Sequence, residues 1–172
     1  MTSGPTAPPP EDAIAGVSDL GENFRAAMRR LASAVGVLTV RGPDGPIGMA
    51  ATSITSLTMD PPALLVCVNH KAALHACMEK DALFCVNLLS RHQSAISAAF
   101  GGGAAHEDRF RQGKWHSAAD GLPRLEDAQA IMICRIEKIV PYGTHSIVIG
   151  AVDEAEVSGA IAPLIYQDGT YL

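Results

Sequence analysis

Hydrophobic and polar positions alternate in a way that predicts short β-strands through most of the chain beyond residue 34. Val35–Val40 is rich in β-branched residues, and the turn-forming run Gly42–Pro46 separates it from a second strand at Ile47–Leu57, so the two are predicted to form a β-hairpin. Further strands are predicted at Ala63–Val68, Leu83–Leu88, Ala130–Val140, His145–Val157 and Leu164–Tyr166.

Helical spacing of apolar residues occurs before and between these strands. A helix from Asp19, where Glu22 completes the spacing of a capping box, places Phe24, Met28 and Leu31 on one apolar face that we expect to pack into the core. Two shorter helices are predicted, one at Ala72–Met78 and one that begins at Ser90 as its N-cap.

The order of these elements predicts the fold class. Most strands follow one another directly along the sequence, whereas strands that alternate with helices would indicate a parallel sheet. We therefore expect a mainly β protein with some α, built as an antiparallel β-barrel with a few helices packed on its outside. Residues 1–18 are rich in proline, glycine, serine and alanine, so they are predicted to form a disordered tail that precedes one domain at residues 19–172.

Composition excludes several classes of protein. A chain of 172 residues with 48% hydrophobic content can bury a sizeable core without disulfides or metals. A net charge of −5 argues against nucleic-acid binding, which needs a basic surface, and 5% aromatic residues offer few stacking platforms. No apolar run approaches the roughly 18–20 residues of a membrane span.

The N-terminal run and the cysteines bear on the cellular compartment. Met1–Pro10 has neither the basic nor the hydrophobic region of a signal peptide. The four cysteines lie in apolar surroundings and form no C-x-x-C pair: Cys67, Cys77, Cys85 and Cys134. Buried, reduced thiols of a cytoplasmic protein are therefore expected.

Common catalytic motifs are absent from the sequence. It contains no G-x-S-x-G, G-x-x-x-x-G-K-[ST], H-E-x-x-H or G-x-G-x-x-G pattern. The six histidines lack the spacing of metal ligands, and the acidic residues do not pair in apolar surroundings. We predict neither a metal site nor acid–base catalysis by paired carboxylates.

Small and hydroxylated residues occupy the start of Gly48–Pro62, where a strand would ordinarily carry valine and isoleucine. The run is Met49, Ala50, Ala51, Thr52 and Ser53. Such residues leave the backbone accessible and supply N–H groups and hydroxyls that suit a flat polar ring or a phosphate. The alternative is a strand at a crowded crossing, where small residues serve packing alone, and composition does not decide between the two.

Other polar residues stand beside buried strands. Asn69, His70 and Lys71 directly follow an apolar strand and suit an anion, although Lys71 alone is equally a solvated loop residue. Asn87 lies inside an apolar strand and needs a partner, which either a ligand or the backbone can supply. Ser90 suits either a helix cap or a phosphate at the start of the helix.

Several segments, taken in order, resemble the flavin reductase domain family. The segments are FRAAMRRLASAVGVLTV, GMAATSITSLTMDPPALLVCVNHKAALHACM, FCVNLLSRHQSAISAAF, RFRQGKW, GLPRLEDAQA, GTHSIVIGAV and PLIYQDGTY. They cover the chain from about Phe24 to Leu172. The resemblance implies the FMN-binding split-barrel fold and an NAD(P)H:flavin oxidoreductase that transfers hydride from NADH or NADPH to FMN or FAD.

The resemblance also implies roles for individual residues. His145, in a G-x-H pattern, matches the catalytic histidine that such enzymes place beside the nicotinamide nucleotide, and Tyr171 matches a residue near the active site. The implied cofactor-binding residues are Met49, Ala50, Ala51, Thr52 and Ser53 at the flavin ring, Asn69, His70 and Lys71 near the ribityl chain and phosphate, and Asn87, Leu88 and Ser90 at a second strand end.

The same resemblance implies partners. Members of this family supply reduced flavin to a partner monooxygenase and are usually homodimers with the flavin near the subunit boundary. The alternative within the same fold is a non-catalytic protein that binds flavin and senses redox state. The turn after the strand at 63–68 reads Asn-His-Lys-Ala here, whereas the family often has Asn-Arg-Ser, which leaves the choice between FMN and FAD open.

Overall fold

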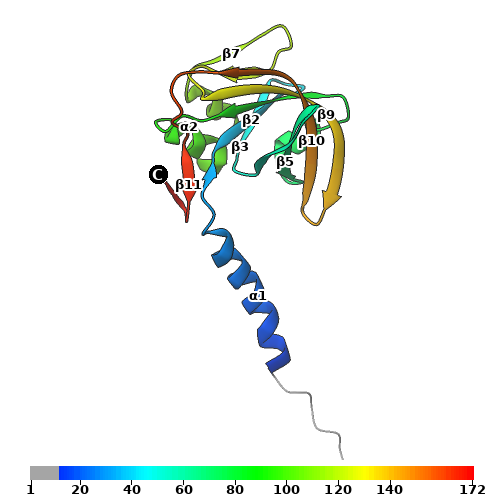
Figure 1. Cartoon of the computed structure of the whole chain (residues 1–172), viewed down its shortest axis with the longest axis vertical. Helices are drawn as coiled ribbons and strands as arrows, with labels where there is room; N and C mark the ends of the chain where they lie inside the picture. Colours follow the sequence, from blue (N-terminus) through cyan, green and yellow to red (C-terminus); the bar gives the residue numbers. More distant parts are fainter. Residues whose placement is uncertain (1–11) are drawn as a thin grey trace, which may run out of the picture.

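The computed structural model describes residues 12–172, and its most prominent feature is a helix that projects from a β-sheet body (Figure 1). This helix, α1 (Asp12–Met28), begins before Asp19, where the sequence predicted it to start. No proline occurs between Pro10 and the end of the helix, so nothing in the backbone interrupts it. The remainder of the predicted tail, residues 1–11, lies outside the described residues, and the domain boundary at residue 19 stays a prediction.

Seven antiparallel strands form the main sheet, as predicted. Their order across the sheet is β3-β2-β6-β9-β10-β5-β4. In that order the strands are Pro46–Ala51, Gly36–Arg41, Leu83–Leu88, Ala130–Tyr142, His145–Val157, Pro62–Asn69 and Ile54–Met59. The two edge strands, β3 and β4, follow each other in the sequence with only Thr52 and Ser53 between them. The sheet must therefore curl until its edges approach, which gives a split barrel.

The predicted single strand Ile47–Leu57 is wrong, because the chain leaves one edge of the sheet and joins the other at Thr52–Ser53. β3 ends at Ala51 and pairs with β2, whereas β4 begins at Ile54 and pairs with β5. Gly36 of β2 permits the two edges to come close: a Cβ at this position would lie 2.6 Å from Cδ1 of Ile54. The Ile54 side chain thus packs across the split.

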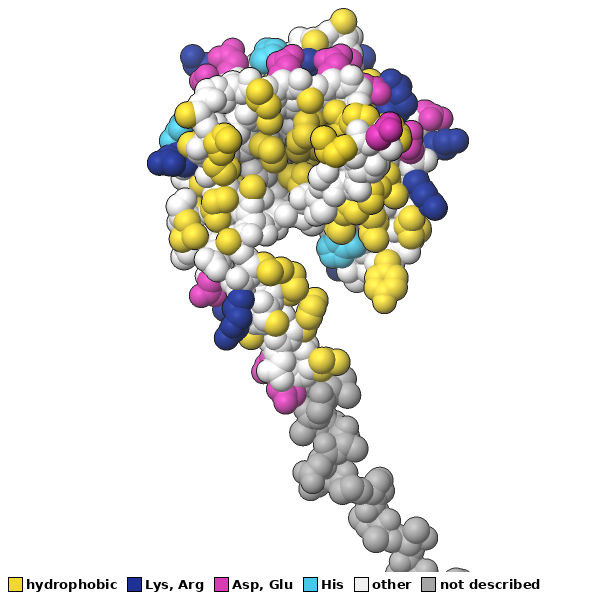
Figure 2. Space-filling model, viewed as in Figure 1, with side chains coloured by type: hydrophobic (Ala, Val, Ile, Leu, Met, Phe, Trp, Pro, Cys, Tyr) yellow, Lys and Arg dark blue, Asp and Glu magenta, His cyan; other side chains and the backbone are white. Residues whose placement is uncertain are grey.

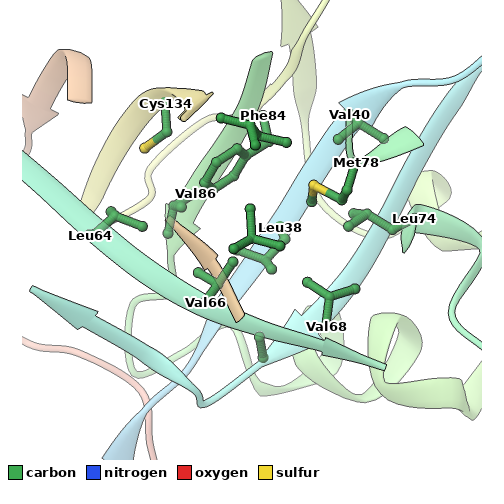
Figure 3. Packing of buried hydrophobic residues seen from close by; sticks show 13 residues of the cluster. Leu38, Val40, Leu64, Val66, Val68, Leu74, Met78, Phe84, Val86 and Cys134 are labelled. Carbon is green, nitrogen blue, oxygen red and sulfur yellow. The ribbon is translucent and has the colours of Figure 1, made fainter. Parts of the chain in front are cut away.

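The barrel interior is filled by the inward-facing residues of the strands (Figure 3). Leu38, Val66 and Val86 are fully buried, as is the ring of Phe84. Phe84 occupies the space beside a β-bulge at Gly150, where a Cβ would lie 2.7 Å from its Cε1 atom. Each fully buried aliphatic side chain contributes about 1.5–3 kcal/mol to stability, so this interior is the main source of folding energy.

Shorter elements cover only part of the barrel's outside. They are β1 (Ser33–Ala34), η1 (Ala73–Cys77), α2 (Ser94–Ala98), η2 (Ala99–Gly103), η3 (His106–Arg111), β7 (Trp115–Ser117), β8 (Pro123–Leu125), β11 (Ile165–Gln167) and β12 (Thr170–Tyr171). Val37, on the outer side of β2, packs with Ile96 of α2 and Phe100 of η2. On β5 and β10 the outward residues Cys67 and Ile147 stay half-buried. The outer face of β5 and β10 is therefore the open one.

The predicted helix start at Ser90 is wrong, because Gln93 is the N-cap of α2. Ser90 donates its hydroxyl to the carbonyl oxygen of Asp127 at 2.8 Å, and its N–H donates to Oε1 of Gln93 at 2.8 Å. This second contact is half of a capping box that lies ahead of the helix. The segment predicted as a helix at Ala72–Met78 forms the 3₁₀ turn η1.

The apolar face of α1 does not pack into the core as predicted. Leu20, Phe24, Met28 and Leu31 are 71%, 64%, 47% and 57% exposed. Figure 2 shows hydrophobic side chains along one side of the helix and a hollowed hydrophobic area on the body above it. None of the described helices is long and apolar enough to cross a membrane.

All four cysteines are free thiols. Cys85 and Cys134 are fully buried, whereas Cys67 and Cys77 are half-buried, so the expected burial is complete for two of them. Burial raises the pKa of Cys85 and that of Cys134 to about 12. These two thiols are therefore neutral and unreactive in the folded protein.

Candidate functional site

Thr52 stands where three hollows of the surface meet. The barrel-mouth hollow, of about 620 Å³, contains Thr52, Ile54, Leu64, Leu88 and Met132. The α1 hollow, of about 450 Å³, contains Thr52 and Ser53 together with the carboxyl end of α1. The tyrosine hollow, of about 230 Å³, lies between Ala50, Ala51, Thr52, Ser97, Tyr166 and Tyr171. Ala50, Ala51, Thr52 and Ser53 thus form an accessible edge, called the Thr52 edge below, as the ligand-binding interpretation requires.

The break between β3 and β4 makes this edge accessible. Ser53 is fixed to β5, because its hydroxyl donates to the carbonyl oxygen of Cys67 at 3.2 Å and its own carbonyl accepts from the Cys67 N–H at 3.3 Å. Thr52 is exposed, and among the described residues none is hydrogen-bonded to its hydroxyl. Its hydroxyl therefore remains available to a ligand.

Two tyrosines close the tyrosine hollow. The Tyr171 hydroxyl lies 2.9 Å from the Ser97 hydroxyl, which ties β12 to α2. The rings of Tyr166 and Tyr171 stand 5.5 Å apart between centroids, at an angle of 60°. Tyr171 and Tyr166 therefore lie beside Ala50, Ala51 and Thr52.

A second polar group lies at the ends of β5 and β10. Asn69 and His145 are directly paired across the two strands. Asn69 accepts the Lys71 N–H through Oδ1 at 2.9 Å, and among the described residues none is hydrogen-bonded to its amide NH₂. The Thr144 hydroxyl lies 2.9 Å from Nδ1 of His145. His145 and Lys71 are both exposed. The end of β5 and the start of β10 thus carry an amide, an ammonium and an imidazole side by side.

The strand register relates this group to the Thr52 edge. Ser53 lies opposite Cys67, Cys67 is paired with Ile147, and His145 is two residues from Ile147 on the same side of β10. With strands about 4.8 Å apart and a rise of about 3.3 Å per residue, the backbones of Ser53 and His145 are about 12 Å apart. Both lie on the open outer face of the sheet.

His70 has a different role from the one the resemblance implied. Its Nε2 atom lies 3.1 Å from the hydroxyl of Ser146, and Nε2 of His75 lies 3.0 Å from the same hydroxyl. Ser146 is buried, and the two imidazole rings are in edge contact. The His70 ring therefore holds the start of β10 in place.

The side chains of Asn87 and Ser90 also form their hydrogen bonds within the fold. The Asn87 side chain is fully buried, donates to the carbonyl oxygen of Val37 and the Thr39 hydroxyl, and accepts the Leu125 N–H at 2.8 Å. These contacts satisfy the amide, so the backbone alternative holds. Ser90 is buried and bonded to Asp127. Neither side chain is free for a cofactor.

The remaining predicted residues divide between the core and the hollows. Met49 packs against the barrel interior, whereas Leu88 lines the barrel-mouth hollow. Sequence reasoning missed Arg25 and Arg29, which line the α1 hollow, and Tyr166. The signal for the arginines was their spacing of four residues, which places two cations on one helix face.

Known proteins of similar sequence match most of this chain's length. Residues 28–172 match the flavin reductase like domain. The protein named FADH(2)-dependent resorcinol hydroxylase, reductase component, from Rhizobium sp. (strain MTP-10005) is 41% identical over 154 residues, which cover 88% of this chain and 86% of that one. FMN reductase (NADH) RutF of Variovorax paradoxus is 38% identical over 149 residues, covering 87% and 83%.

A solved structure extends the comparison to cofactors. The Streptomyces globisporus C-1027 NADH:FAD oxidoreductase SgcE6, in complex with NAD and FAD fragments, superposes with a TM-score of 0.80 at 27% identity. The alignment covers 88% of this chain and 91% of that chain. The likeness spans nearly the whole β body.

Proposed function

This chain belongs to the flavin reductase like family, and we propose that its reaction takes place on the outer face that carries Ser53 and His145. The protein is an NAD(P)H-dependent flavin reductase, an oxidoreductase that supplies reduced flavin. The observation that carries the location is the shared outer face of the Thr52–Ser53 edge and the His145 group, joined through β5.

The residues at the Thr52 edge fit a flavin ring. Ala50 and Ala51 carry only methyl side chains, so a flat ring can approach the backbone, and the exposed Thr52 hydroxyl supplies a hydrogen bond. Tyr171 offers an aromatic wall beside them. At the far end, the Asn69 amide and the Lys71 ammonium suit the ribityl chain and a phosphate.

When bound, the flavin supplies N5 as the hydride acceptor and the nicotinamide supplies the hydride from C4. The chain's own residues hold the two rings in contact and exclude water between them. Thr144 bonds Nδ1 of His145, which leaves Nε2 as the nitrogen available to the nucleotide. His145 thereby orients the nicotinamide. The hydride transfer itself requires no acid or base, because it moves no proton between the rings.

Release of the product flavin follows from the modest set of contacts. On the flavin's side of the proposed site the cation is Lys71, an exposed side chain with no ion-pair partner among the described residues. Ligands held by a few exposed hydrogen bonds dissociate readily, which suits a reductase that passes reduced flavin to a partner monooxygenase. We place this protein and its partner monooxygenase in the cytoplasm.

The exposed apolar face of α1 supports a homodimer. Leu20, Phe24 and Met28 on one face of α1, and Leu31 just after it, are exposed in the single chain. The outer face of β5 and β10 beside the proposed site is apolar and half-buried. A second copy that covers both surfaces would also exclude water from the bound rings. The flavin would then lie near the subunit boundary.

A steady-state assay tests this function. Purified protein is mixed with NADH or NADPH and with FMN, FAD or riboflavin, and the loss of nicotinamide absorbance is followed. A flavin-dependent loss is expected with at least one pair. Binding of flavin without any such loss would favour the non-catalytic flavin-binding alternative.

A further inference from the structure

We infer that the α1 hollow binds a phosphate group of the nicotinamide dinucleotide, with Arg25 and Arg29 as its cations. This inference rests on the proposed function and adds a subsite to it. The hollow lies between the carboxyl end of α1 and the turn of the β11–β12 hairpin, with Thr52 and Ser53 as its floor. A ligand on the Thr52 edge therefore extends directly into it.

The two arginines leave a net positive charge in this hollow. They are four residues apart, so both project from the same side of the helix end. Arg29 pairs with Asp168 at 3.6 Å, but the side chains are 62% and 69% exposed, so this pair contributes little. Among the described side chains no carboxylate lies within ion-pair distance of Arg25. Two guanidinium groups thus face one carboxylate.

The rest of the lining suits a phosphate. Guanidinium groups bind phosphate oxygens in pairs of parallel hydrogen bonds, which a lysine cannot do. Ser33 and Ser53 also line the hollow, together with Gly169 in the hairpin turn. The protein carries a net charge of −5, so a cationic hollow next to the proposed site is a local exception to its overall charge.

Two phosphate-bearing ligands meet in the proposed reaction, and the site has two separate cationic places. Lys71 follows Asn69 at the carboxyl end of β5, and the proposed flavin orientation directs the ribityl phosphate there. The α1 hollow lies on the other side of Ser53, beyond the Thr52 edge. With Lys71 taken by the flavin phosphate, the arginine pair is left for the phosphates of the nicotinamide dinucleotide.

The competing explanation is a purely structural role. Cations at the carboxyl end of a helix interact favourably with its dipole, and this would explain arginines here without a ligand. Arg30 is a matched control, because it stands at the same helix end and its guanidinium donates to the carbonyl oxygen of Ala26 outside the lining of the hollow. A structural or overall charge effect would appear equally in Arg30→Gln.

Isothermal titration of the full-length protein with NAD⁺, FMN, riboflavin and nicotinamide riboside tests the inference. Arg25→Gln and Arg29→Gln are each expected to weaken NAD⁺ binding about tenfold. Binding of FMN and of nicotinamide riboside, which lacks phosphate, should change less than about twofold, as should NAD⁺ binding by Arg30→Gln. In steady-state assays the two variants should raise KM for NADH and leave kcat nearly unchanged.

Three outcomes would overturn the inference. They are unchanged NAD⁺ binding in Arg25→Gln and Arg29→Gln, an equal loss in Arg30→Gln, and weaker binding of FMN but not of riboflavin, which would assign the hollow to the flavin phosphate. Each leaves the proposed function standing if the wild type still oxidises NADH with flavin. A wild type without that activity would instead refute the proposed function.

Discussion

Ser53 and His145 lie on the same outer face of the seven-stranded sheet, with β5 between them. The Ser53 hydroxyl is bonded to Cys67 of β5, Cys67 is paired with Ile147 of β10, and His145 stands two residues further along. A separation of about 12 Å follows from strand spacing and rise. The two proposed halves of the site are therefore parts of one surface, and each can be changed without the other.

Replacement of His145 should affect the nicotinamide nucleotide and spare the flavin. His145→Ala is expected to lower kcat/KM for NADH by roughly ten- to a hundredfold, because the nucleotide loses its orienting contact. The dissociation constant of the flavin, measured by fluorescence titration, should change less than about twofold. His116→Ala, an exposed histidine on β7, serves as the control. If His145→Ala lost flavin binding and kept the same dependence on the NADH concentration, His145 would belong to the flavin half of the site and not to the nucleotide half.

Replacement of Ser53 should weaken flavin binding. Ser53→Val removes the hydroxyl that bonds Cys67 and adds bulk at the Thr52 edge, so we expect the flavin dissociation constant to rise about tenfold. Ser53→Ala separates the two effects, because it removes the hydroxyl without added volume. Unchanged flavin affinity in both variants would mean that the small residues serve packing alone.

Replacement of Asn87 should cost stability. Asn87→Leu leaves the Leu125 N–H, the Val37 carbonyl and the Thr39 hydroxyl without their buried partner, so the free energy of unfolding should fall by about 2–4 kcal/mol. Urea unfolding followed by circular dichroism measures this change. Gln112→Leu, at an exposed amide, should stay within about 0.5 kcal/mol of the wild type. A similar small change at Asn87 would show that its hydrogen bonds contribute little.

Alkaline pH should destabilise the protein through its buried thiols. The pKa of Cys85 and that of Cys134 are raised by burial from 9.0 to about 12. Above pH 9 the unfolded chain therefore holds fewer protons on these groups than the folded one, and stability falls as the pH rises from 9 towards 12. Below this range the contribution is fully present. The pH dependence in Cys85→Ala should be shallower, and an unaltered slope would contradict this account.

The exposed face of α1 should control the oligomeric state. Phe24→Glu places a charge among Leu20, Met28 and Leu31, so it is expected to shift the proposed dimer to a monomer in sedimentation experiments. Asn23→Glu adds the same charge beside that face and should leave the dimer intact. Monomeric wild-type protein, or equal behaviour of both variants, would argue against α1 as the interface.

Much of the fold could be predicted because its pattern is local. The apolar runs Ala63–Val68 and Leu83–Leu88 identified two strands of the barrel, and Gly42–Pro46 identified the turn between β2 and β3. The break at Thr52–Ser53 could not be found in this way, because it depends on the two edges of the sheet meeting across Gly36. Periodicity within one segment carries no signal of such closure.

The candidate site was predictable only in part, for a similar reason. Thr52 and His145 are exposed and Ser53 is half-buried, since small or polar residues at strand ends tend to remain accessible, and their roles in a site stay predictions. The roles of Asn87 and His70 depend on partners 38–76 residues away, Leu125 and Ser146, that no local pattern reveals. The prediction that the apolar stripe of α1 packs into the core was wrong, because helical periodicity shows which face is apolar but not whether the rest of the chain covers it.

A crystal structure of the protein with oxidised FMN and NAD⁺ bound together tests the central claim most directly. The account predicts the flavin ring against Thr52 and Ser53 on the outer face of β5, with the nicotinamide stacked on it and within contact of His145. Rings bound on opposite sides of the sheet, or a flavin inside the barrel-mouth hollow away from His145 of both subunits, would contradict it.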